Sequence, residues 1–511
     1  MPPFELLLAT CVGLFFWLIL KPGWLRPLLS ILPMIGFYQA YPRFHTAFGR
    51  TFRLSDISEL PELLHVLPTP TLLIAGAVAL FLTAIYTLHL NRSLRMGLIV
   101  ATVLAASLVG AVEFAPDQYL ALTHPLMRKI SPWSEWKTAE ESGYLATTLY
   151  AEARRKNAQQ KLLSSHYAVM ANTNQQTFLR QLKTRTHLPN IHLIILESFL
   201  DPSLFKDLEF SRPPISRRLQ RIMGDQGSIV ISPVFGGNTA QAEFEALCGA
   251  PALAHFSSIE FNLFSGSNAR CLPDTLRESG YLTIASNAFR PDFFNEETAY
   301  RGLGFSEINF PKQYYSGKTY LSNNSDNYFM FDSDLYSQNL DHLRQQLKRG
   351  RPVFNYVLGI YGHHPHTLGN QRKPLVELRP KRNQPAGPLL RNAVTQALYR
   401  TRALASYLEQ LIELDPESII IVFGDHLPVL DGGVTTYHQF NYLGNGAYRR
   451  VRGYIIEKGT PHRYTDIHEY EIPQLILSFV LNQPYRPATT ASTDDKHREQ
   501  EYLSVMANAI R

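Results

Sequence analysis

The stretch NIHLIILESF, residues Asn190–Phe199, decides the fold of the larger part of this 511-residue chain. It is a short apolar run that ends in the acid Glu197, a pattern typical of a buried parallel strand with a functional residue at its carboxyl end. SIIIVFGDH at Ser418–His426 and PVFNYVLGIYGHHPH at Pro352–His366 have the same form, and helical patterns such as Leu389–Leu414 separate them. The alternation predicts an α/β domain with a mostly parallel sheet sandwiched by helices.

The ends of these strands carry the acids and histidines from which a metal site can be built. Ligands of α/β proteins gather at the carboxyl ends of the strands, and Glu197, Asp425 and His426 all follow such ends. Mixed oxygen and nitrogen ligands suit one divalent metal, Mn²⁺ or Zn²⁺, with Mg²⁺ as a third possibility. Taken singly, Glu197 is as compatible with an ordinary salt bridge, and His363 in the HHPH stretch with a solvated loop.

A hydroxyl beside two glycines supplies a candidate nucleophile. The stretch FGGNTAQAEFEALCG places Thr239 at the start of a predicted helix, directly after Gly236, Gly237 and Asn238. Backbone N–H groups at such a start favour an anion, and a nearby metal lowers the pKa of a hydroxyl. The combination predicts phosphoryl-type chemistry. The alternative is that Thr239 only caps the helix, because threonine is a common capping residue.

The first 115 residues are predicted to form a transmembrane domain of three to four helices. Three stretches are apolar over about the length that one bilayer needs: Phe4–Leu20, Leu72–Leu88 and Met96–Phe114. A fourth, Leu28–Tyr38, is shorter and contains Pro33. It is compatible with a span extended by its flanks, a re-entrant segment or a segment on the membrane surface.

The basic residues of the short loops predict the orientation of these helices. Lys21 and Arg26 lie in one loop, and Arg92 and Arg95 lie in another. Because basic loops stay inside, four crossings place the large C-terminal part outside the cytoplasm. We therefore expect a multi-pass protein of the bacterial inner (plasma) membrane, with its catalytic domain on the periplasmic or extracellular side.

The rest of the chain divides into three further segments. Residues 116–185 are predicted to be an amphipathic helical linker at the membrane, with Trp133, Trp136, Tyr144 and Tyr150 at the headgroup layer. A plain helical linker is the alternative. Residues 186–487 are the predicted catalytic domain, and 488–511 an exposed polar tail.

Composition excludes several classes of protein. The net charge of +6 is small for this length and forms no basic stripe, which disfavours a nucleic-acid partner. Contents of 12% aromatic and 18% charged residues exclude a disordered chain. Three cysteines exclude a disulfide scaffold or a cysteine-based zinc finger. A transporter is disfavoured because the three clear spans carry no charge near their middle.

Taken together, these motifs resemble the lipoteichoic acid synthase and phosphoglycerol transferase branch of the alkaline phosphatase/sulfatase superfamily, roughly over 190–484. NIHLIILESF matches the family strand whose glutamate binds metal, here Glu197, and FGDH matches its aspartate–histidine pair, Asp425 and His426. FGGNTAQAEFEALCG is similar to the segment that carries the nucleophile, here Thr239. HHPH resembles a motif whose first histidine contacts the substrate phosphate, here His363.

The resemblance implies an activity and its partners. Thr239 would attack a phospholipid donor such as phosphatidylglycerol, with the metal held by Glu197, Thr239, Asp425 and His426. The phospho-threonine intermediate would then pass its group to a glycan or glycolipid acceptor. Gly237 would bind the phosphate through the backbone, and the oligomeric state stays open.

Two departures from the family pattern leave undecided which headgroup is transferred. Asn287 and Glu296 stand where the family has a histidine and an arginine, and Arg290 is the candidate to replace the lost positive charge. Phosphoethanolamine transfer is therefore the first alternative to phosphoglycerol transfer. A hydrolase that releases the headgroup to water and a non-catalytic membrane sensor on the same fold are further alternatives.

Two cysteines of the predicted domain need a separate explanation. CLPDTLRESG, starting at Cys271, is similar to the signature of true sulfatases, but that signature has arginine where this chain has Thr275. We therefore do not expect a sulfatase. Cys271 and Cys248 either pair as a disulfide, which an oxidising periplasm permits, or are two free buried thiols.

Overall fold

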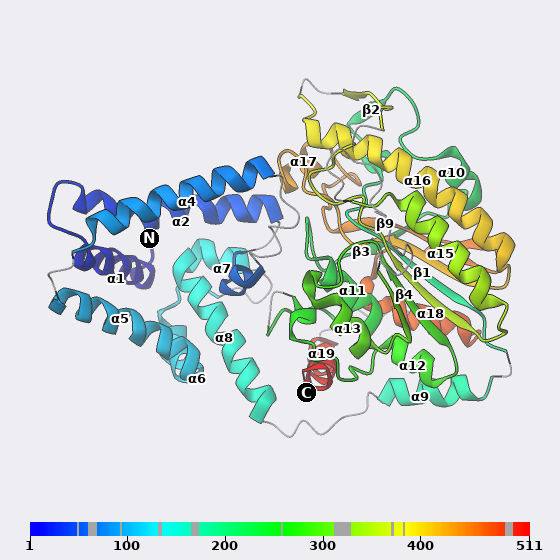
Figure 1. Ribbon diagram of the computed structural model, residues 1–511, viewed down its shortest axis with the longest axis horizontal. Helices are drawn as coiled ribbons and strands as arrows, with labels where there is room; N and C mark the ends of the chain where they lie inside the picture. The colour runs from blue at the N-terminus through cyan, green and yellow to red at the C-terminus, as the bar shows by residue number, and fades with distance from the viewer. Residues whose placement is uncertain are drawn as a thin grey trace. The chain divides into compact units, whose positions relative to one another are not determined.

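The computed structural model describes most of the chain, namely residues 1–48, 51–59, 69–91, 95–130, 135–164, 173–185, 187–256, 259–310, 329–368, 372–381, 384–485 and 494–510. The chain folds into two compact units (Figure 1). The N-terminal unit comprises residues 1–165 and 255–258, and the C-terminal unit comprises residues 166–254 and 259–511.

The N-terminal unit is helical. Its α-helices are α1 (Pro3–Ile19), α2 (Arg26–Phe48), α4 (Thr69–His89), α5 (Arg95–Phe114), α6 (Pro116–Thr123), α7 (Glu135–Ser142) and α8 (Tyr144–Ser164). Among the residues described, Leu72–His89 of α4 is one stretch long and apolar enough to cross a membrane. A second candidate is α5 continued into α6, bent by 106°, and α1 is a shorter apolar helix. The structure thus supports one or two candidate spans, and a domain of three to four spans stays a prediction.

The fourth apolar stretch, Leu28–Tyr38, lies inside α2, a helix that its flanks extend and that continues through Pro33 and Pro42. Whether it spans the membrane stays a prediction. One part of the chain differs from the predicted segments. Residues 116–185 are not one linker. Helices α6 to α8 belong to the N-terminal unit, whereas α9 (Thr173–Lys183) belongs to the C-terminal unit.

A buried carboxylate joins α8 to α1. The side chain of Glu5 is buried in α1 and accepts hydrogen bonds from the backbone N–H groups of Leu145 (3.0 Å) and Ala146 (2.8 Å). The first N–H groups of a helix lack intrahelical partners, so Glu5 caps α8. Trp136 and Tyr144, predicted to lie at the headgroup layer, stack on His45 (3.9 Å) and Tyr41 (4.4 Å) of α2. Trp133 lies outside the described residues.

The C-terminal unit is built on one mixed sheet. Its strand order is β11–β3–β9–β8–β1–β6–β4–β5, with β10 paired to β9. The strands are β1 (Ile191–Leu196), β3 (Ser228–Ile231), β4 (Leu282–Asn287), β5 (Glu307–Asn309), β6 (Val353–Leu358), β8 (Ile419–Gly424), β9 (Arg450–Glu457), β10 (Thr460–His462) and β11 (Ile467–His468). A separate antiparallel pair is formed by β2 (Leu208–Phe210) and β7 (Leu378–Pro380).

The centre of this sheet is parallel, as the sequence predicts. Strands β8, β1, β6, β4 and β5 run parallel, and Ile195 of β1 lies opposite Phe423 and Leu358. Each residue of β1, β6 and β8 is buried, which explains their continuous apolar runs. At one edge the sheet is mixed, because β9 pairs antiparallel with both β8 and β3.

Helices cover both faces of the sheet (Figure 1). They are α10 (Arg217–Met223), α11 (Thr239–Cys248), α12 (Leu272–Glu278), α13 (Glu296–Leu303), α15 (Asp332–Leu347), α16 (Pro388–Leu414), α17 (Val434–Gln439), α18 (Ile472–Val480) and α19 (Asp494–Ala509). Figure 1 shows α15 and α16 on one side and α11, α12 and α13 on the other.

The predicted polar tail is wrong for 494–509. These residues form α19, in which Tyr502 and Met506 are fully buried, and Ser265 donates a hydrogen bond to the carbonyl of Ala509 (3.0 Å). The segment looks polar because only one face of the helix is apolar.

A disulfide joins Cys248 at the end of α11 to Cys271 directly before α12. Of the two alternatives left open by the sequence, the structure therefore has the paired one. The bridge closes a loop of 23 residues beside the helix that begins at Thr239.

We expect the double substitution Cys248→Ser/Cys271→Ser to lower the free energy of unfolding by about 3 kcal/mol, because a cross-link of this length restricts the unfolded chain. Denaturant unfolding of the C-terminal unit, followed in the full-length protein, measures the effect. The matched control is Cys11→Ser, since Cys11 is a free, exposed thiol. Equal stability of the double variant and this control would contradict the expectation.

Candidate metal centre and nucleophile

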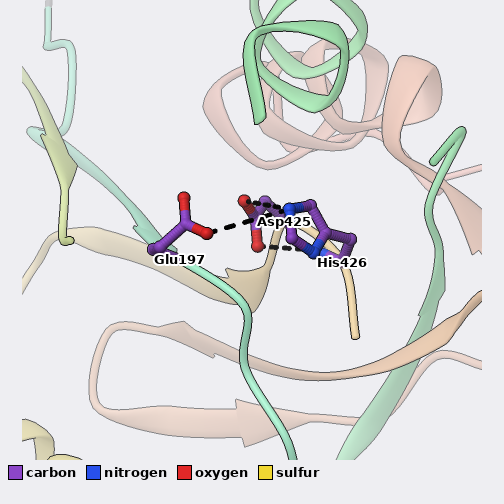
Figure 2. A group of neighbouring side chains, drawn as sticks. All are labelled: Glu197, Asp425 and His426. Carbon is purple, nitrogen blue, oxygen red and sulfur yellow. Dashed lines mark hydrogen bonds and ion pairs between the residues drawn. The ribbon is translucent and has the colours of Figure 1, made fainter. Parts of the chain in front are cut away.

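The candidate site lies where β1 and β8 end side by side. Glu197 follows β1, and Asp425 and His426 follow β8, so the parallel register brings the three residues together. Their ligand atoms all lie within 4.8 Å of one another, and all three side chains are buried. Figure 2 shows the three side chains pointing toward one another.

Thr239 joins this group through a hydrogen bond. Its Oγ1 donates to Glu197 Oε2 at 2.7 Å, and Ser198 Oγ donates to the other oxygen, Oε1, also at 2.7 Å. Asp425 is held by its Oδ1, which accepts from the backbone N–H groups of Ser198 (2.7 Å) and His426 (2.6 Å). Every oxygen of the two carboxylates except Asp425 Oδ2 is therefore fixed by the protein.

The atoms left over are those that a cation would bind. Asp425 Oδ2 and His426 Nε2 are buried without a hydrogen bond. Because His426 Nδ1 lies 3.1 Å from the carbonyl oxygen of Leu427, Nδ1 carries the proton and Nε2 presents its lone pair. That lone pair faces Asp425 Oδ2 at 3.3 Å and Glu197 Oε1 at 3.8 Å. Three electron-rich atoms facing one another fit a bound divalent cation.

Burial and the charges of neighbouring groups shift the pKa values of all three residues. Burial and the charge of Glu197 raise the pKa of Asp425 well above its usual value. Burial lowers the pKa of His426, so its neutral, ligand form is favoured. Burial alone would raise the pKa of Glu197, but His426, His363 and the hydrogen bonds from Thr239 and Ser198 lower it. Without a cation the protein interior disfavours two charged carboxylates here.

The loop before Thr239 brings its backbone close to this group. The N–H of Gly236 donates to the carbonyl of Leu427 (3.1 Å), which ties the loop to the segment after His426. Gly237 has φ of +153°, and the space where its side chain would stand is open. Asn238 has φ of +65°, the left-handed conformation that polar residues tolerate, and α11 starts directly after it. The N–H groups at this start can meet an anion.

The remaining predicted residues are placed as follows. His363 lies close enough to lower the pKa of Glu197, and its Nδ1 donates to the carbonyl of His364 (2.8 Å). Asn287 is buried at the end of β4, where its amide donates to Glu296 and to the hydroxyl of Tyr300 (3.0 Å). The two departures from the family pattern, Asn287 and Glu296, are thus bonded to each other.

Arg290, the candidate to replace the lost positive charge, lies at the surface, and its role stays a prediction. It is an exposed residue whose guanidinium donates to both carboxylate oxygens of Asp292, at 3.0 and 2.7 Å. The charge of Arg290 is therefore already offset at the surface of the protein.

Sequence reasoning missed a buried arginine that supports Glu197. Arg400 of α16 donates from Nη1 to the backbone carbonyl of Glu197 and from Nε to Asp332, both at 2.7 Å. Gly362 lies beside them, and a side chain there would overlap the Glu197 carbonyl and the Arg400 guanidinium. Arg400 lies in the predicted helix Leu389–Leu414, and an arginine in a helix carries no local signal that separates an inward position from an exposed one.

Two further buried acids lie in the turns of α11 that follow Thr239. Glu243 Oε2 accepts hydrogen bonds from the hydroxyls of Tyr300 (2.6 Å) and Tyr356 (2.8 Å). Glu245 Oε1 accepts from the backbone N–H of Ala252 (2.9 Å). Burial raises the pKa of each carboxyl to about 8. The EFE stretch therefore forms part of the protein interior beneath the nucleophile.

A divalent cation should stabilise the folded protein, because it binds the native group and not the unfolded chain. In wild-type protein freed of metal, adding Mn²⁺ or Zn²⁺ should raise the melting temperature. Asp425→Asn should abolish that increase without lowering the metal-free melting temperature, since the asparagine Oδ1 can keep both backbone hydrogen bonds and the site without metal already disfavours a charged Asp425. Asp341→Asn, at an exposed position, is the control. An equal response of Asp425→Asn and wild type would rule out this site.

The raised pKa of Glu245 predicts a pH dependence of stability. Between its ordinary value of 4.5 and about 8, the folded chain holds a proton that the unfolded chain has released. Stability from this group is therefore complete at low pH and is lost as the pH rises through this window, by up to about 1.4 kcal/mol per pH unit. Glu245→Gln should reduce the slope, measured by urea unfolding in chelator.

The control for this pH series is Glu278→Gln, at an exposed position near the end of α12. It should keep the wild-type slope. A Glu245→Gln variant with the slope of the control would show that Glu245 is ionised in the folded protein at neutral pH.

Comparison with known proteins shows the family to which this chain belongs. The family profile described as Sulfatase matches residues 189–500, more than half of the chain. A relative from Rhizobium meliloti (strain 1021), described as a putative cyclic beta-1,2-glucan modification protein, is 28% identical over 260 residues, which are 50% of this chain. The chain matches 38% of the length of that relative.

Two solved structures are similar in fold at low sequence identity. The phosphoglycerol transferase GacH of Streptococcus pyogenes, in complex with sn-glycerol-1-phosphate, is 17% identical, with a TM-score of 0.49 over 70% of this chain and 93% of that one. The lipoteichoic acid synthase LtaP of Listeria monocytogenes is 15% identical, with a TM-score of 0.48 over 61% of this chain and 79% of that one. On the extent of the profile match, the chain belongs to the Sulfatase family.

Proposed function

We propose that this chain is a membrane-anchored, metal-dependent phosphotransferase. It moves a phospholipid headgroup, phosphoglycerol from phosphatidylglycerol, to a glycan or glycolipid outside the cytoplasm. The observation that carries the proposal is the hydrogen bond of Thr239 Oγ1 to Glu197 (2.7 Å), within the same group as Asp425 and His426. A hydroxyl held in this way at a helix start is suited to attack phosphorus.

The reaction divides into two balanced steps. In the first, Thr239 Oγ1 forms a bond to the phosphorus of the donor, the bond from phosphorus to the diacylglycerol oxygen breaks, and the proton of Thr239 ends on that oxygen. In the second, an acceptor hydroxyl forms the new bond to phosphorus, the Thr239–phosphate bond breaks, and Thr239 regains a proton. Water in place of the acceptor would make the same site a hydrolase.

Side chains of the protein orient both steps. Glu197 accepts the hydrogen bond that points the Thr239 hydroxyl, and Arg400 holds the backbone of Glu197 in place. Gly237 leaves open space for phosphate oxygens beside the first N–H groups of α11. His363 lies near Glu197 and is the candidate to bind those oxygens or protonate the leaving group.

Glu197, Thr239, Asp425 and His426 would hold the divalent cation, Mn²⁺ or Zn²⁺, or Mg²⁺. When bound, it would lower the pKa of the Thr239 hydroxyl and offset charge on the phosphate oxygens.

Sulfate ester hydrolysis is a poorer fit, although the family carries that name. The cysteine that begins the sulfatase-like stretch, Cys271, is joined to Cys248 and is not free to react. Thr239, by contrast, is bonded directly to the candidate metal group. The glucan relative from Rhizobium supports a glycan acceptor, within the part of its length that matches.

The cellular location is part of the proposal. Candidate α4 and the α5–α6 pair would anchor the chain in the bacterial inner membrane, near a donor that is confined to the bilayer. The Cys248–Cys271 disulfide supports a C-terminal unit in the oxidising periplasm. Tethering would raise the local concentration of the lipid donor.

Phosphoethanolamine transfer is the second candidate, and one contact favours it. Asn287 and Glu296, which replace a histidine and an arginine of the resembled family, bond to each other in a buried pair. Neither residue offers a permanent positive charge to a headgroup, so the headgroup contacts differ from those of the phosphoglycerol branch.

Thr239→Ala should lower headgroup transfer at least about a thousandfold, because it removes the nucleophile and leaves the fold intact. Release of diacylglycerol from phosphatidylglycerol or phosphatidylethanolamine vesicles, with and without a glucan, measures turnover and names the donor. Thr184→Ala, at an exposed threonine, is the control. Undiminished turnover by Thr239→Ala would overturn the proposal, and no turnover by wild type with any donor would favour a sensor.

A further inference from the structure

A pocket of the C-terminal unit that contains none of the candidate metal ligands is lined by four arginines. It has a volume of about 580 Å³ and lies between the segment that follows β2, the start of α10 and the middle of α16. The arginines are Arg212, Arg217, Arg218 and Arg402. Within the described part of the chain, no Asp or Glu lines this pocket.

Three of these four charges are available to a ligand. Arg218 donates to both carboxylate oxygens of Glu409, which offsets its charge. Arg212, Arg217 and Arg402 are exposed, and the described residues give their side chains no hydrogen bond or ion pair. Several unpaired guanidinium groups around one hollow repel one another unless an anion lies between them. Their planar forks match the oxygens of phosphate groups.

The backbone that carries the arginines is fixed. The Ser211 N–H donates to the carbonyl of Glu377 (3.0 Å), and the Ser216 N–H donates to Thr401 Oγ1 (2.9 Å). Ser216 and Thr401 are both buried. The loop that carries Arg212 is therefore held by the fold at both of its ends.

The pocket faces away from the candidate metal centre. Arg400 and Arg402 are two positions apart on α16, which turns the chain by about 200°. Arg400 points inward to the carbonyl of Glu197, whereas Arg402 lines the pocket. An anion bound here is therefore not the group that reacts at Thr239.

The size and the positive charge of the pocket favour an organic phosphate ester over a bare ion. The volume lies in the range of about 300–1,000 Å³ that holds an organic ligand rather than a bare ion.

We propose that this arginine pocket binds phosphate ester groups carried by an anionic glycan. The proposal rests on the proposed function, because a glycan that has already received phosphoglycerol groups carries such esters. One modified unit held in the pocket keeps the glycan bound to the protein, which raises the effective concentration of its remaining hydroxyl groups around the C-terminal unit. The pocket is thus a docking site for the product of earlier rounds.

The test compares binding of a phosphorylated dextran and an unmodified dextran of equal length to the full-length protein. Wild type should bind the phosphorylated form with an affinity that falls as salt rises. The triple variant Arg212→Ser/Arg217→Ser/Arg402→Ser should lose about tenfold or more of this affinity. The control removes the same number of exposed arginines outside the pocket, Arg301, Arg344 and Arg391, and should keep the affinity. Arg301 and Arg344 pair with Glu297 and Asp341, so the control tests for a general effect of lost surface arginines.

One further readout separates this proposal from the proposed function, and a second shows that the loss of affinity does not come from misfolding. Binding should survive in Thr239→Ala, so a failure of the chemistry at Thr239 leaves the docking result intact. The single variant Arg402→Ser should lose part of the affinity with an unchanged melting temperature.

Loss of less than about twofold in the triple variant, or an equal loss in the control, would overturn the proposal. So would pocket-dependent binding to phosphatidylglycerol vesicles in place of the dextran.

Discussion

Two buried carboxylates and the lone pair of one buried imidazole meet where β1 and β8 end, and the C-terminal unit is arranged around that concentration of negative charge. Glu197, Asp425 and His426 place their ligand atoms within 4.8 Å of one another. The protein offers hydrogen bonds to three of the four carboxylate oxygens and leaves Asp425 Oδ2 and His426 Nε2 open. Without a cation, burial and mutual repulsion disfavour the charged form of these carboxylates, whereas a bound cation would stabilise it.

The surrounding elements hold this group in place. Arg400 reaches from α16 to the Glu197 carbonyl, and the loop that bears Gly236 is tied to the segment after His426. Helix α11 starts at Thr239 with its hydroxyl on Glu197, contains the buried Glu243 and Glu245, and ends at a disulfide. The nucleophile and the metal ligands are thus positioned by separate elements whose packing fixes the distances between them.

Much of this site follows from local sequence, and the rest depends on tertiary contacts. The apolar runs before Glu197 and Asp425 predict buried parallel strands, and parallel strands bring their carboxyl ends together. Arg400, in contrast, lies on a long helix where no local pattern separates an inward position from an exposed one. The burial of α19 and the antiparallel β9 also depend on which neighbours the sheet offers. The predicted polar tail was therefore wrong, and the sheet, parallel at its centre as predicted, is mixed at one edge. The number of membrane spans is a prediction that the structure supports for one or two helices.

The measurement that tests the central claim most directly is the intact mass of the detergent-purified protein. It would be mixed with Mn²⁺, phosphatidylglycerol and phosphatidylethanolamine without any acceptor and quenched with acid within milliseconds. The account predicts a covalent adduct that maps to Thr239, with the mass of the transferred headgroup. Release of diacylglycerol with no adduct, or an adduct at a different residue, would contradict the assignment of Thr239 as the nucleophile.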